Sequence, residues 1–349
     1  MIQVELLKAI SEIPGAPGFE QKVREYVIAQ AGPLVDELSV DAMGNVIAVK
    51  KGRVGKRVMV AAHMDEIGFI VTHIDDDGFI RFHTLGGFDP KTLTSQRVIV
   101  HGSKDLMGVM GSKPIHLMKP DERNKAPQIH DFFIDTGLPK KEIEKYISVG
   151  NPITRDRELI EMGDCVNGKS LDNRVSVYIL LELLSELQGV ELPYDLYAVF
   201  TVQEEVGLRG ALKSGHLIDP DFGFGLDVTI AFDVPGSQPH EVVTKMGGGA
   251  AIKIMDGTTI CDYRMVQYMK EVATKHSIPF QLEVLPAGGT DTAGVQRSGK
   301  NGAIAGAVSI PLRHIHQVIE MASKSDIRAS IDLLKVSVLE LDQYDWSFR

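Results

Sequence analysis

The apolar residues of this chain change their period along the sequence, and each period predicts a different element. Apolar residues recur at helical spacing in two stretches near the N-terminus, residues 4–13 and 23–31. Residues 57–62 are then almost continuously apolar, which is typical of a strand that is buried on both faces of a parallel sheet. The first 66 residues therefore predict two helices followed by strands.

Two later changes in the pattern divide the chain. Residues 67–163 contain short apolar runs separated by Gly- and Asp-rich turns, which indicates a β-rich segment. From residue 164, helical and strand patterns alternate up to a closing helix at 326–341, which we expect Ser325 to cap. The sequence predicts an α/β domain, residues 1–66 and 164–349, with a mostly parallel sheet and helices on both faces. A β-rich insert, residues 67–163, interrupts it.

Composition excludes several classes of protein. The chain has 349 residues, of which 37 are Lys or Arg and 47 are Asp or Glu, and its net charge of −10 argues against nucleic acid as a partner. No apolar run approaches the roughly 20 residues that a membrane helix needs, and residues 1–20 do not resemble a secretory signal. Only two cysteines occur, Cys165 and Cys261, which favours a reducing compartment and hence the cytoplasm.

Potential metal ligands gather in five short segments that follow or lie in predicted strands. These segments are His63-Met-Asp65-Glu66, Asp172-Asn-Arg174, Gln203-Glu204-Glu205, Asp227 and His314-Ile-His316. Each has a plain alternative, such as a surface turn, a solvated acid pair or a core histidine. Because the carboxyl ends of parallel strands meet at one edge, their coincidence favours a site for zinc, or for cobalt or manganese. Two ions would need a carboxylate that bridges them.

A competing signal is the segment Gly163-Asp-Cys-Val-Asn-Gly-Lys169-Ser170, which satisfies the phosphate-loop pattern. A nucleotide-binding protein is therefore an alternative. The residues before Gly163 are a weak candidate for the buried strand that such a loop requires, and Asp172 would crowd the start of the following helix. This alternative also leaves the histidines and Asp227 unexplained.

Five motifs in this order and spacing resemble a known family. They are Ala62-His-Met-Asp-Glu-Ile-Gly-Phe69, Ser170-Leu-Asp-Asn-Arg174, Val202-Gln-Glu-Glu-Val-Gly207, Gly288-Gly-Thr-Asp291 and Arg313-His-Ile-His316. Over essentially its whole length the chain resembles the M42 metallo-aminopeptidases, which include glutamyl, leucyl, lysyl and deblocking enzymes and the tetrahedral TET particles. The resemblance implies a two-metal peptidase fold with an inserted β-barrel dimerisation domain.

The resemblance also implies a role for each site residue. His63 corresponds to a terminal metal ligand, Asp65 to the acid that orients it, and Asp172 to the bridging carboxylate. Glu204 corresponds to the general base, Glu205 and Asp227 to ligands of one ion each, and His316 to the last ligand. The chain departs from the family pattern at His314, where an aromatic residue is common, and at Gln317, where a small hydroxyl residue is common.

These roles predict the release of N-terminal amino acids from peptides, with two metal ions per chain, metal-bound hydroxide as nucleophile and Glu204 as base. Alternatives are a deacylase of N-acyl amino acids and a catalytically silent scaffold. We expect loops 247–249 and 288–291 to shape the substrate pocket. We also expect a homo-oligomer, a dimer or a dodecamer, with apolar surface supplied by Phe69, Ile70, Phe79, Ile80 and Phe82.

Overall fold

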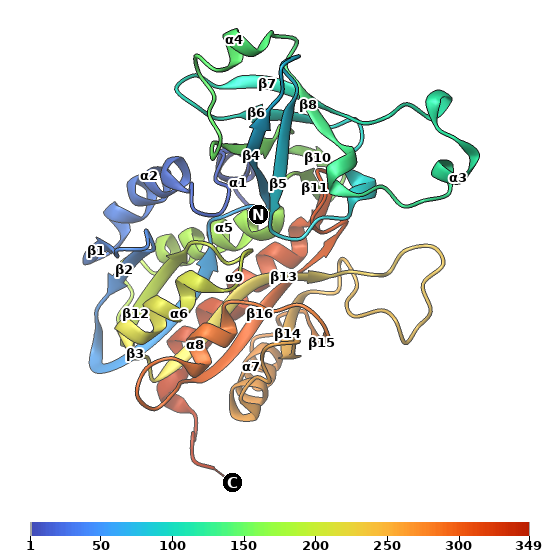
Figure 1. Cartoon of the computed structure of the whole chain (residues 1–349). Helices are drawn as coiled ribbons and strands as arrows, with labels where there is room; N and C mark the ends of the chain where they lie inside the picture. Colours follow the sequence, from blue (N-terminus) through green and yellow to red (C-terminus); the bar gives the residue numbers. More distant parts are fainter. Residues whose placement is uncertain (1, 349) are drawn as a thin grey trace.

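Two bodies of unequal size make up the chain, a large sheet covered by helices and a small closed barrel (Figure 1). The structure is a computed structural model and describes residues 2–348. The two N-terminal helices expected from the sequence are α1 (Val4–Glu12) and α2 (Gln21–Ala31). A short 3-10 helix, η1 (Gly32–Leu34), follows them and leads into the large sheet.

The large sheet has eleven strands and its centre is parallel. Its main path runs in the order β1 (Glu37–Val40), β2 (Val46–Lys50), β12 (Leu192–Thr201), β3 (Gly52–His63), β13 (Phe222–Ile230), β16 (Ile304–Arg313), β17 (Glu320–Ser323), β11 (Cys165–Gly168) and β10 (Ile160–Met162). Strand β14 (Ala250–Met255) pairs with β16 and with β15 (Phe280–Val284). The four central strands β12, β3, β13 and β16 are mutually parallel, while the strands outside them on the main path pair antiparallel.

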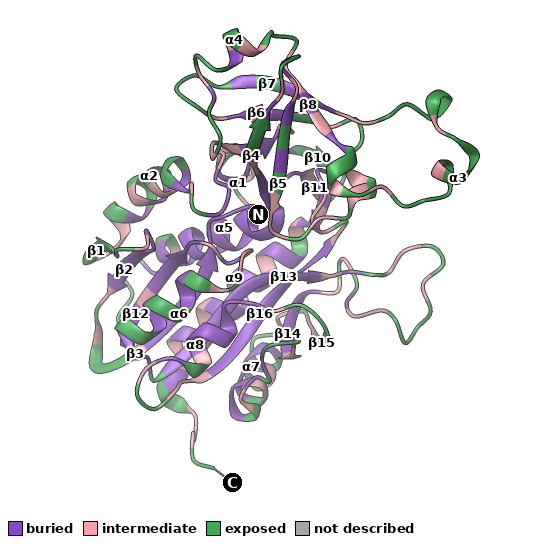
Figure 2. Ribbon diagram, viewed as in Figure 1, coloured by how far each residue is buried: buried purple, intermediate pink, exposed green. Residues whose placement is uncertain are grey.

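Helices cover both faces of this sheet, as the alternating pattern predicted. Helices α5 (Leu171–Glu186), α7 (Tyr263–Lys275) and α9 (Lys324–Leu339) pack on one face, and α6 (Arg209–Ile218) and α8 (Thr292–Arg297) on the other. Alternate residues of β3 serve the two cores: Val58 and Val60 join the larger cluster, Met59 the smaller. The buried interior of the sheet region is visible in Figure 2.

One detail of the closing helix differs from the prediction. The side chain of Ser323 accepts a hydrogen bond from the backbone N–H of Ser325, so Ser323 is the cap and α9 starts at Lys324. The sequence offers a serine at both positions, and the end of β17 at Ser323 decides between them. A 3-10 helix, η5 (Leu341–Gln343), follows α9.

The small body is a closed six-stranded barrel. Its strands run in the order β4 (Gly68–Ile74), β5 (Ile80–Leu85), β8 (Phe133–Asp135), β7 (Leu106–Gly111), β6 (Arg97–Val100) and β9 (Pro152–Arg155). The short helices η2 (Pro90–Thr92), η3 (Ile115–Leu117), α3 (Pro120–Arg123), η4 (Ile129–Asp131) and α4 (Lys140–Ile143) lie in its loops. The fold class, an α/β sheet with a β-barrel, is thus confirmed. The domain boundaries stay a prediction. Strand β10 lies within the predicted insert, but it pairs with β11 of the large sheet.

The apolar residues expected on the barrel surface lie mostly inside it. Phe69, Ile80 and Phe82 belong to the buried barrel core, and Ile70 and Phe79 are half-buried. The prediction of their exposure is therefore wrong, because alternation along β4 and β5 turns these side chains inward. The exposed large apolar residues of this region include Met107, Val109, Ile115, Leu117 and Val149.

The phosphate-loop alternative does not fit the structure. Residues 160–168 form a β-hairpin of β10 and β11, where a loop over a helix start would be required. Lys169 is only 3% exposed, and its Nζ is 2.7 Å from Oε1 of Glu66. A lysine held in a buried ion pair is not free to bind a phosphate. Among residues 2–348, none of the helices is long and apolar enough to cross a bilayer.

Candidate metal centre

The predicted site residues lie together at one edge of the large sheet. His63 is the last residue of β3, Glu204 and Glu205 come shortly after β12, and His316 comes shortly after β16. Asp227 lies within β13, and Asp172 lies in the first turn of α5. Because β12, β3, β13 and β16 are parallel neighbours, their carboxyl ends bring these side chains to one place.

Asp172 lies between the two histidines. Its Oδ1 is 3.4 Å from Nε2 of His63, and its Oδ2 is 3.1 Å from Nε2 of His316. Asp227 lies 3.8 Å from the same His63 nitrogen, and Glu205 lies 3.5 Å from the same His316 nitrogen. Two donor groups result, one of His63, Asp172 and Asp227, and one of Asp172, Glu205 and His316. Asp172 is shared by both.

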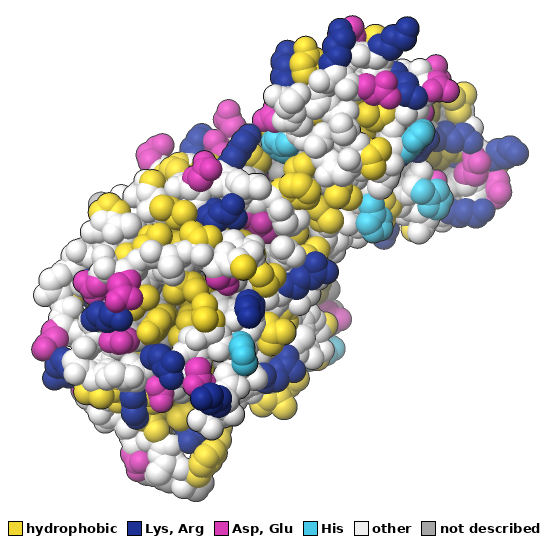
Figure 3. Space-filling view, turned by 60° about the vertical axis from the view of Figure 1, so that its left-hand side comes forward, with side chains coloured by type: hydrophobic (Ala, Val, Ile, Leu, Met, Phe, Trp, Pro, Cys, Tyr) yellow, Lys and Arg dark blue, Asp and Glu magenta, His cyan; other side chains and the backbone are white. Residues whose placement is uncertain are grey.

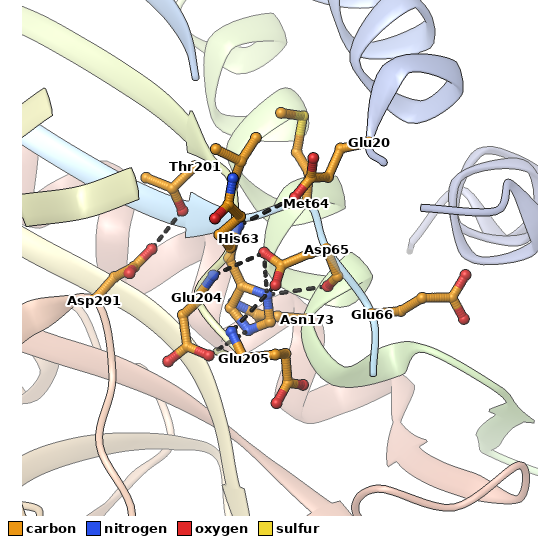
Figure 4. A network of polar contacts seen from close by, with 12 residues as sticks. Glu20, His63, Met64, Asp65, Glu66, Asn173, Thr201, Glu204, Glu205 and Asp291 are labelled. Carbon is orange, nitrogen blue, oxygen red and sulfur yellow. Dashed lines mark hydrogen bonds and ion pairs between the residues drawn. The ribbon is translucent and has the colours of Figure 1, made fainter. Parts of the chain in front are cut away.

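Asp65 contacts His63 and the backbone of both glutamates. Nδ1 of His63 lies 3.1 Å from the backbone carbonyl of Asp65, which can only accept, so Nδ1 carries a proton and Nε2 is the nitrogen that would face a metal. The carboxylate of Asp65 accepts the backbone N–H of Glu204 (3.0 Å) and of Glu205 (3.1 Å). Figure 4 shows Asp65 among His63, Glu204 and Glu205. One buried acid therefore fixes one histidine and both glutamates.

Glu204 lies beside the donors and is itself buried. Its Oε2 is 3.7 Å from Nε2 of His63, and it forms a third possible group with His63 and Glu205. Burial raises the pKa of Glu204 well above its ordinary value. The positive charge of His63 opposes this rise, and the negative charges of Asp227 and Glu205 add to it. A carboxylate with a raised pKa is a better proton acceptor near neutral pH.

The pKa values of the other candidate ligands are shifted because acids and histidines lie close together in a buried site. Burial raises the pKa of both Glu205 and Asp227 to about 8, and the charge of Asp172 adds to both shifts. Burial lowers the pKa of His316, but the hydrogen bond to Asp172 and the charge of Glu205 outweigh it and raise the value to about 10. Four carboxylates with buried side chains around two histidines leave excess negative charge, which divalent cations would neutralise. The donor set therefore fits metal ions.

A cavity of about 610 Å³ opens beside these groups. Residues 288–290 line it as expected, whereas 247–249 do not. The backbone N–H groups of Gly247 and Gly249 instead donate to Asp326. His314 is exposed and belongs to none of the donor groups found among the described residues.

Sequence reasoning missed two charged side chains at this site. Lys253 lines the cavity, fully buried, with Nζ 3.2 Å from both Asp256 and Glu283. A lysine within the otherwise apolar residues 250–255 was a signal that could have been used. Glu320, also fully buried, accepts the backbone N–H of Asp172 (3.0 Å). Nothing in its local sequence, beyond an acid in a short strand, distinguishes Glu320.

Comparison with known proteins decides the family. The family model of the M42 glutamyl aminopeptidases matches residues 44–333. The chain belongs to the M42 aminopeptidase family. The lysyl aminopeptidase of Pyrococcus furiosus is 34% identical, with 99% of this chain and 100% of the relative covered. The resemblance seen in the motifs is thereby confirmed.

Solved structures agree with this assignment. The TET aminopeptidase of a marine sediment Thaumarchaeota archaeon is 37% identical and superimposes with a TM-score of 0.94, covering 97% of this chain and 96% of that one. The TET1 peptidase of Pyrococcus horikoshii, which can assemble into a tetrahedron or a large octahedral shell, is 30% identical with a TM-score of 0.87, covering 97% and 99%. This M42 chain is thus an aminopeptidase of a metal-dependent family.

Proposed function

We propose that this M42 protein is a two-metal aminopeptidase that releases N-terminal amino acids from peptides. The observation that carries the proposal is Asp172, whose two oxygens face different histidines at 3.4 and 3.1 Å, as a bridging carboxylate requires. His63, Asp172 and Asp227 would hold one ion, and Asp172, Glu205 and His316 the other. Mixed histidine and carboxylate donors suit zinc, and also cobalt or manganese.

The protein's own groups divide the work of hydrolysis. Bound divalent ions would polarise the scissile carbonyl and lower the pKa of an attacking water. Glu204, with its raised pKa, would accept the proton of that water and pass it to the leaving amine. Asp65 would keep Glu204 in place through the backbone N–H that it accepts. Asp65 acts through its neighbours and is a positioning residue.

The cavity beside the donors would receive the first side chain of the peptide. Apolar residues line part of it, including Ile230, Leu285 and Ile315, and Thr258 and Thr290 offer hydroxyl groups. A free N-terminal amine, unlike an acylated one, would offer its lone pair to a bound ion. Recognition of a free amine is what separates an aminopeptidase from an endopeptidase or from a deacylase.

Location and assembly complete the proposal. Cys165 and Cys261 are both unpaired, which supports a reducing cytoplasm. The relatives that form TET shells support a homo-oligomer, either a dimer or a larger particle. Peptides are the proposed partners, and the net charge of −10 disfavours nucleic acid.

A substrate panel tests the proposal against the deacylase alternative. Zinc- or cobalt-loaded protein is assayed with aminoacyl-nitroanilides and short peptides, and in parallel with N-acetyl and N-succinyl amino acids. Turnover of substrates with a free N-terminal amine, lost when that amine is acetylated, is the expected result. Turnover of only the N-acyl amino acids would reject the peptidase proposal.

A further inference from the structure

The metal ligand His316 has an unusual backbone conformation that something must hold. Its φ is 63°, in the left-handed region that non-glycine residues rarely adopt unless their surroundings fix them. The backbone carbonyl of His316 accepts a hydrogen bond from Nη1 of Arg155 at 3.1 Å. Arg155 is the last residue of β9, so this contact joins the barrel to the candidate metal centre.

Arg155 is itself fixed by the barrel. It is 3% exposed, it pairs with Val98 of β6, and its guanidinium carbon lies 5.5 Å from the ring centre of Phe88. The ring of Phe88 stacks on Phe69 of the barrel core, with a centroid distance of 4.4 Å. A buried guanidinium held on a packed aromatic ring has little freedom, so it can define the position of the carbonyl that it contacts.

Two buried polar atoms of this region have no hydrogen-bond partner in the structure. Nε of Arg155 is buried without a hydrogen-bond partner, and so is Oε1 of Glu320. The other oxygen of Glu320 accepts the backbone N–H of Asp172. Burial raises the pKa of Glu320 to about 8, the charge of Asp172 adds to this, and the charge of Arg155 opposes it.

A second part of the barrel lies against the same ligands. Gly86 and Gly87 follow β5, and a Cβ on Gly87 would lie 3.5 Å from Nδ1 of His316. Gly86 has a φ of 98°, and a Cβ there would lie 3.4 Å from Cβ of Glu205. His316 and Glu205 belong to one donor group, and the loop that follows β5 passes close to both of them. His63 and Asp227 of the other group lie on strands of the large sheet.

We propose that the barrel helps to build one of the two metal positions, and that Arg155 is the positioning residue that does so by holding His316 toward Asp172 and Glu205. The proposal rests on the two-metal function proposed above. It assigns the barrel a role in the metal centre that is independent of assembly. Loss of Arg155 should weaken the ion at Asp172, Glu205 and His316 and leave the ion at His63 and Asp227 bound.

The experiment measures zinc binding to full-length protein. Metal-free wild type, Arg155→Met, Arg155→Lys and the control Arg97→Met are equilibrated with zinc over a series of chelator-buffered concentrations. Bound zinc per chain is measured by mass spectrometry of the metal. Arg97 is a matched control because it lies on the adjacent strand β6 with its side chain 67% exposed, 3.7 Å from Asp156. The melting temperature of each metal-free protein is recorded in parallel.

For Arg155→Met we expect the affinity for one ion to fall about 10–100-fold, as for other groups that support a metal ligand. The second ion should bind as in wild type. Arg155→Lys keeps the charge, so its zinc affinity should lie between those of wild type and Arg155→Met. It also serves as the second variant if the change to methionine weakens folding. Arg97→Met should match wild type.

Two results would overturn the role of Arg155 alone: wild-type zinc binding in Arg155→Met, or equal loss of both ions together with a lowered metal-free melting temperature. The latter would indicate a merely structural residue. Wild-type protein that binds fewer than two zinc ions would instead contradict the two-metal function. The two failures are therefore distinguishable.

Discussion

Asp65 shows how a single buried acid can set the chemistry of several neighbours. It is fully buried and accepts the backbone N–H groups of two successive residues, Glu204 and Glu205. These bonds point the two glutamates, which are adjacent in sequence, toward different neighbours. Glu204 lies 3.7 Å from His63, and Glu205 lies 3.5 Å from His316. Adjacent residues of the same type can therefore carry different functions.

The first prediction separates these two glutamates. Glu204→Gln keeps the size and most hydrogen bonds of the side chain but cannot accept a proton, so turnover should fall about 10²–10⁴-fold while both ions stay bound. Glu205→Gln removes a charged donor of the group with His316 and should lower metal occupancy. Turnover and metal content are measured for both variants side by side. Near-normal turnover of Glu204→Gln with two ions bound would contradict the proposed base.

The second prediction concerns the shared carboxylate. Asp172→Ala removes a donor from both groups, so both ions should be lost at zinc concentrations that saturate wild type. His63→Ala removes a donor from the group with Asp227 and should loosen chiefly that ion. Metal content after dialysis is the measurement. Two ions retained per chain by Asp172→Ala would rule out a bridging role.

The third prediction concerns pH. Glu205, Asp227 and His316 must each lose a proton before they can bind a cation, because burial and the charge of Asp172 raise the pKa of the two acids to about 8 and contacts with Asp172 and Glu205 raise the pKa of His316 to about 10. Zinc binding to metal-free protein at pH 6.5 should therefore release protons, and affinity should rise with pH up to 8 and beyond. Calorimetric titration in two buffers of different ionisation enthalpy measures the protons released. Identical heats in the two buffers would contradict the raised values.

At the scale of elements, the junction of β11 and α5 explains why a phosphate-loop pattern occurs without a phosphate site. Lys169 donates to both oxygens of Glu66 at 2.7 and 2.8 Å, and the hydroxyl of Ser170 also donates to Glu66. Glu66 follows Asp65 on the segment after β3. The lysine and serine of the pattern thus tie the start of α5, which carries Asp172, to the segment that carries Asp65.

The fourth prediction tests this tie. Lys169→Met leaves buried Glu66 with only the more distant guanidinium of Arg174, 3.9 Å away, as a charge partner, and the free energy of unfolding should fall by up to about 3–5 kcal/mol. The double variant Lys169→Met with Glu66→Gln removes the weakly paired charge of Glu66 and should recover part of that loss. Urea unfolding of the metal-free proteins measures both. A single variant as stable as wild type would show that this ion pair contributes nothing to stability.

Site residues could be predicted from the sequence where they directly follow a buried strand. They could not be predicted where their role depends on contacts between elements that are distant in the sequence. His63, Glu204 and Glu205 could be found because each follows an apolar run that had to be a buried strand. Arg155 and Glu320 could not, since their importance depends on the barrel and β17 approaching the same ligands. The inward turn of Phe69 and Phe82 was likewise undecided until the strands closed into a barrel.

At the scale of the whole molecule, the two bodies expose different kinds of surface. Figure 3 shows a larger and a smaller lobe joined at a narrower waist. In the smaller lobe, Met107, Val109, Ile115 and Leu117 are exposed within a short stretch of chain, at 50%, 49%, 61% and 69%. We expect another molecule to cover this surface, because exposed apolar side chains favour burial.

The last prediction follows from this surface. We expect at least a dimer at micromolar concentration, with Ile115 and Leu117 covered by a second copy. The double change Ile115→Asp and Leu117→Asp would bury charge in that contact and should lower the mass measured by light scattering. Val54→Asp is the control, because Val54 is 55% exposed on the large body. It should leave the mass unchanged.

A wild-type protein that is strictly monomeric would contradict the assembly, while a double variant with wild-type mass would place the interface elsewhere on the chain. Activity of the dissociated variant with two ions bound would show in addition that the metal centre, including its contacts with the barrel, is complete within one chain.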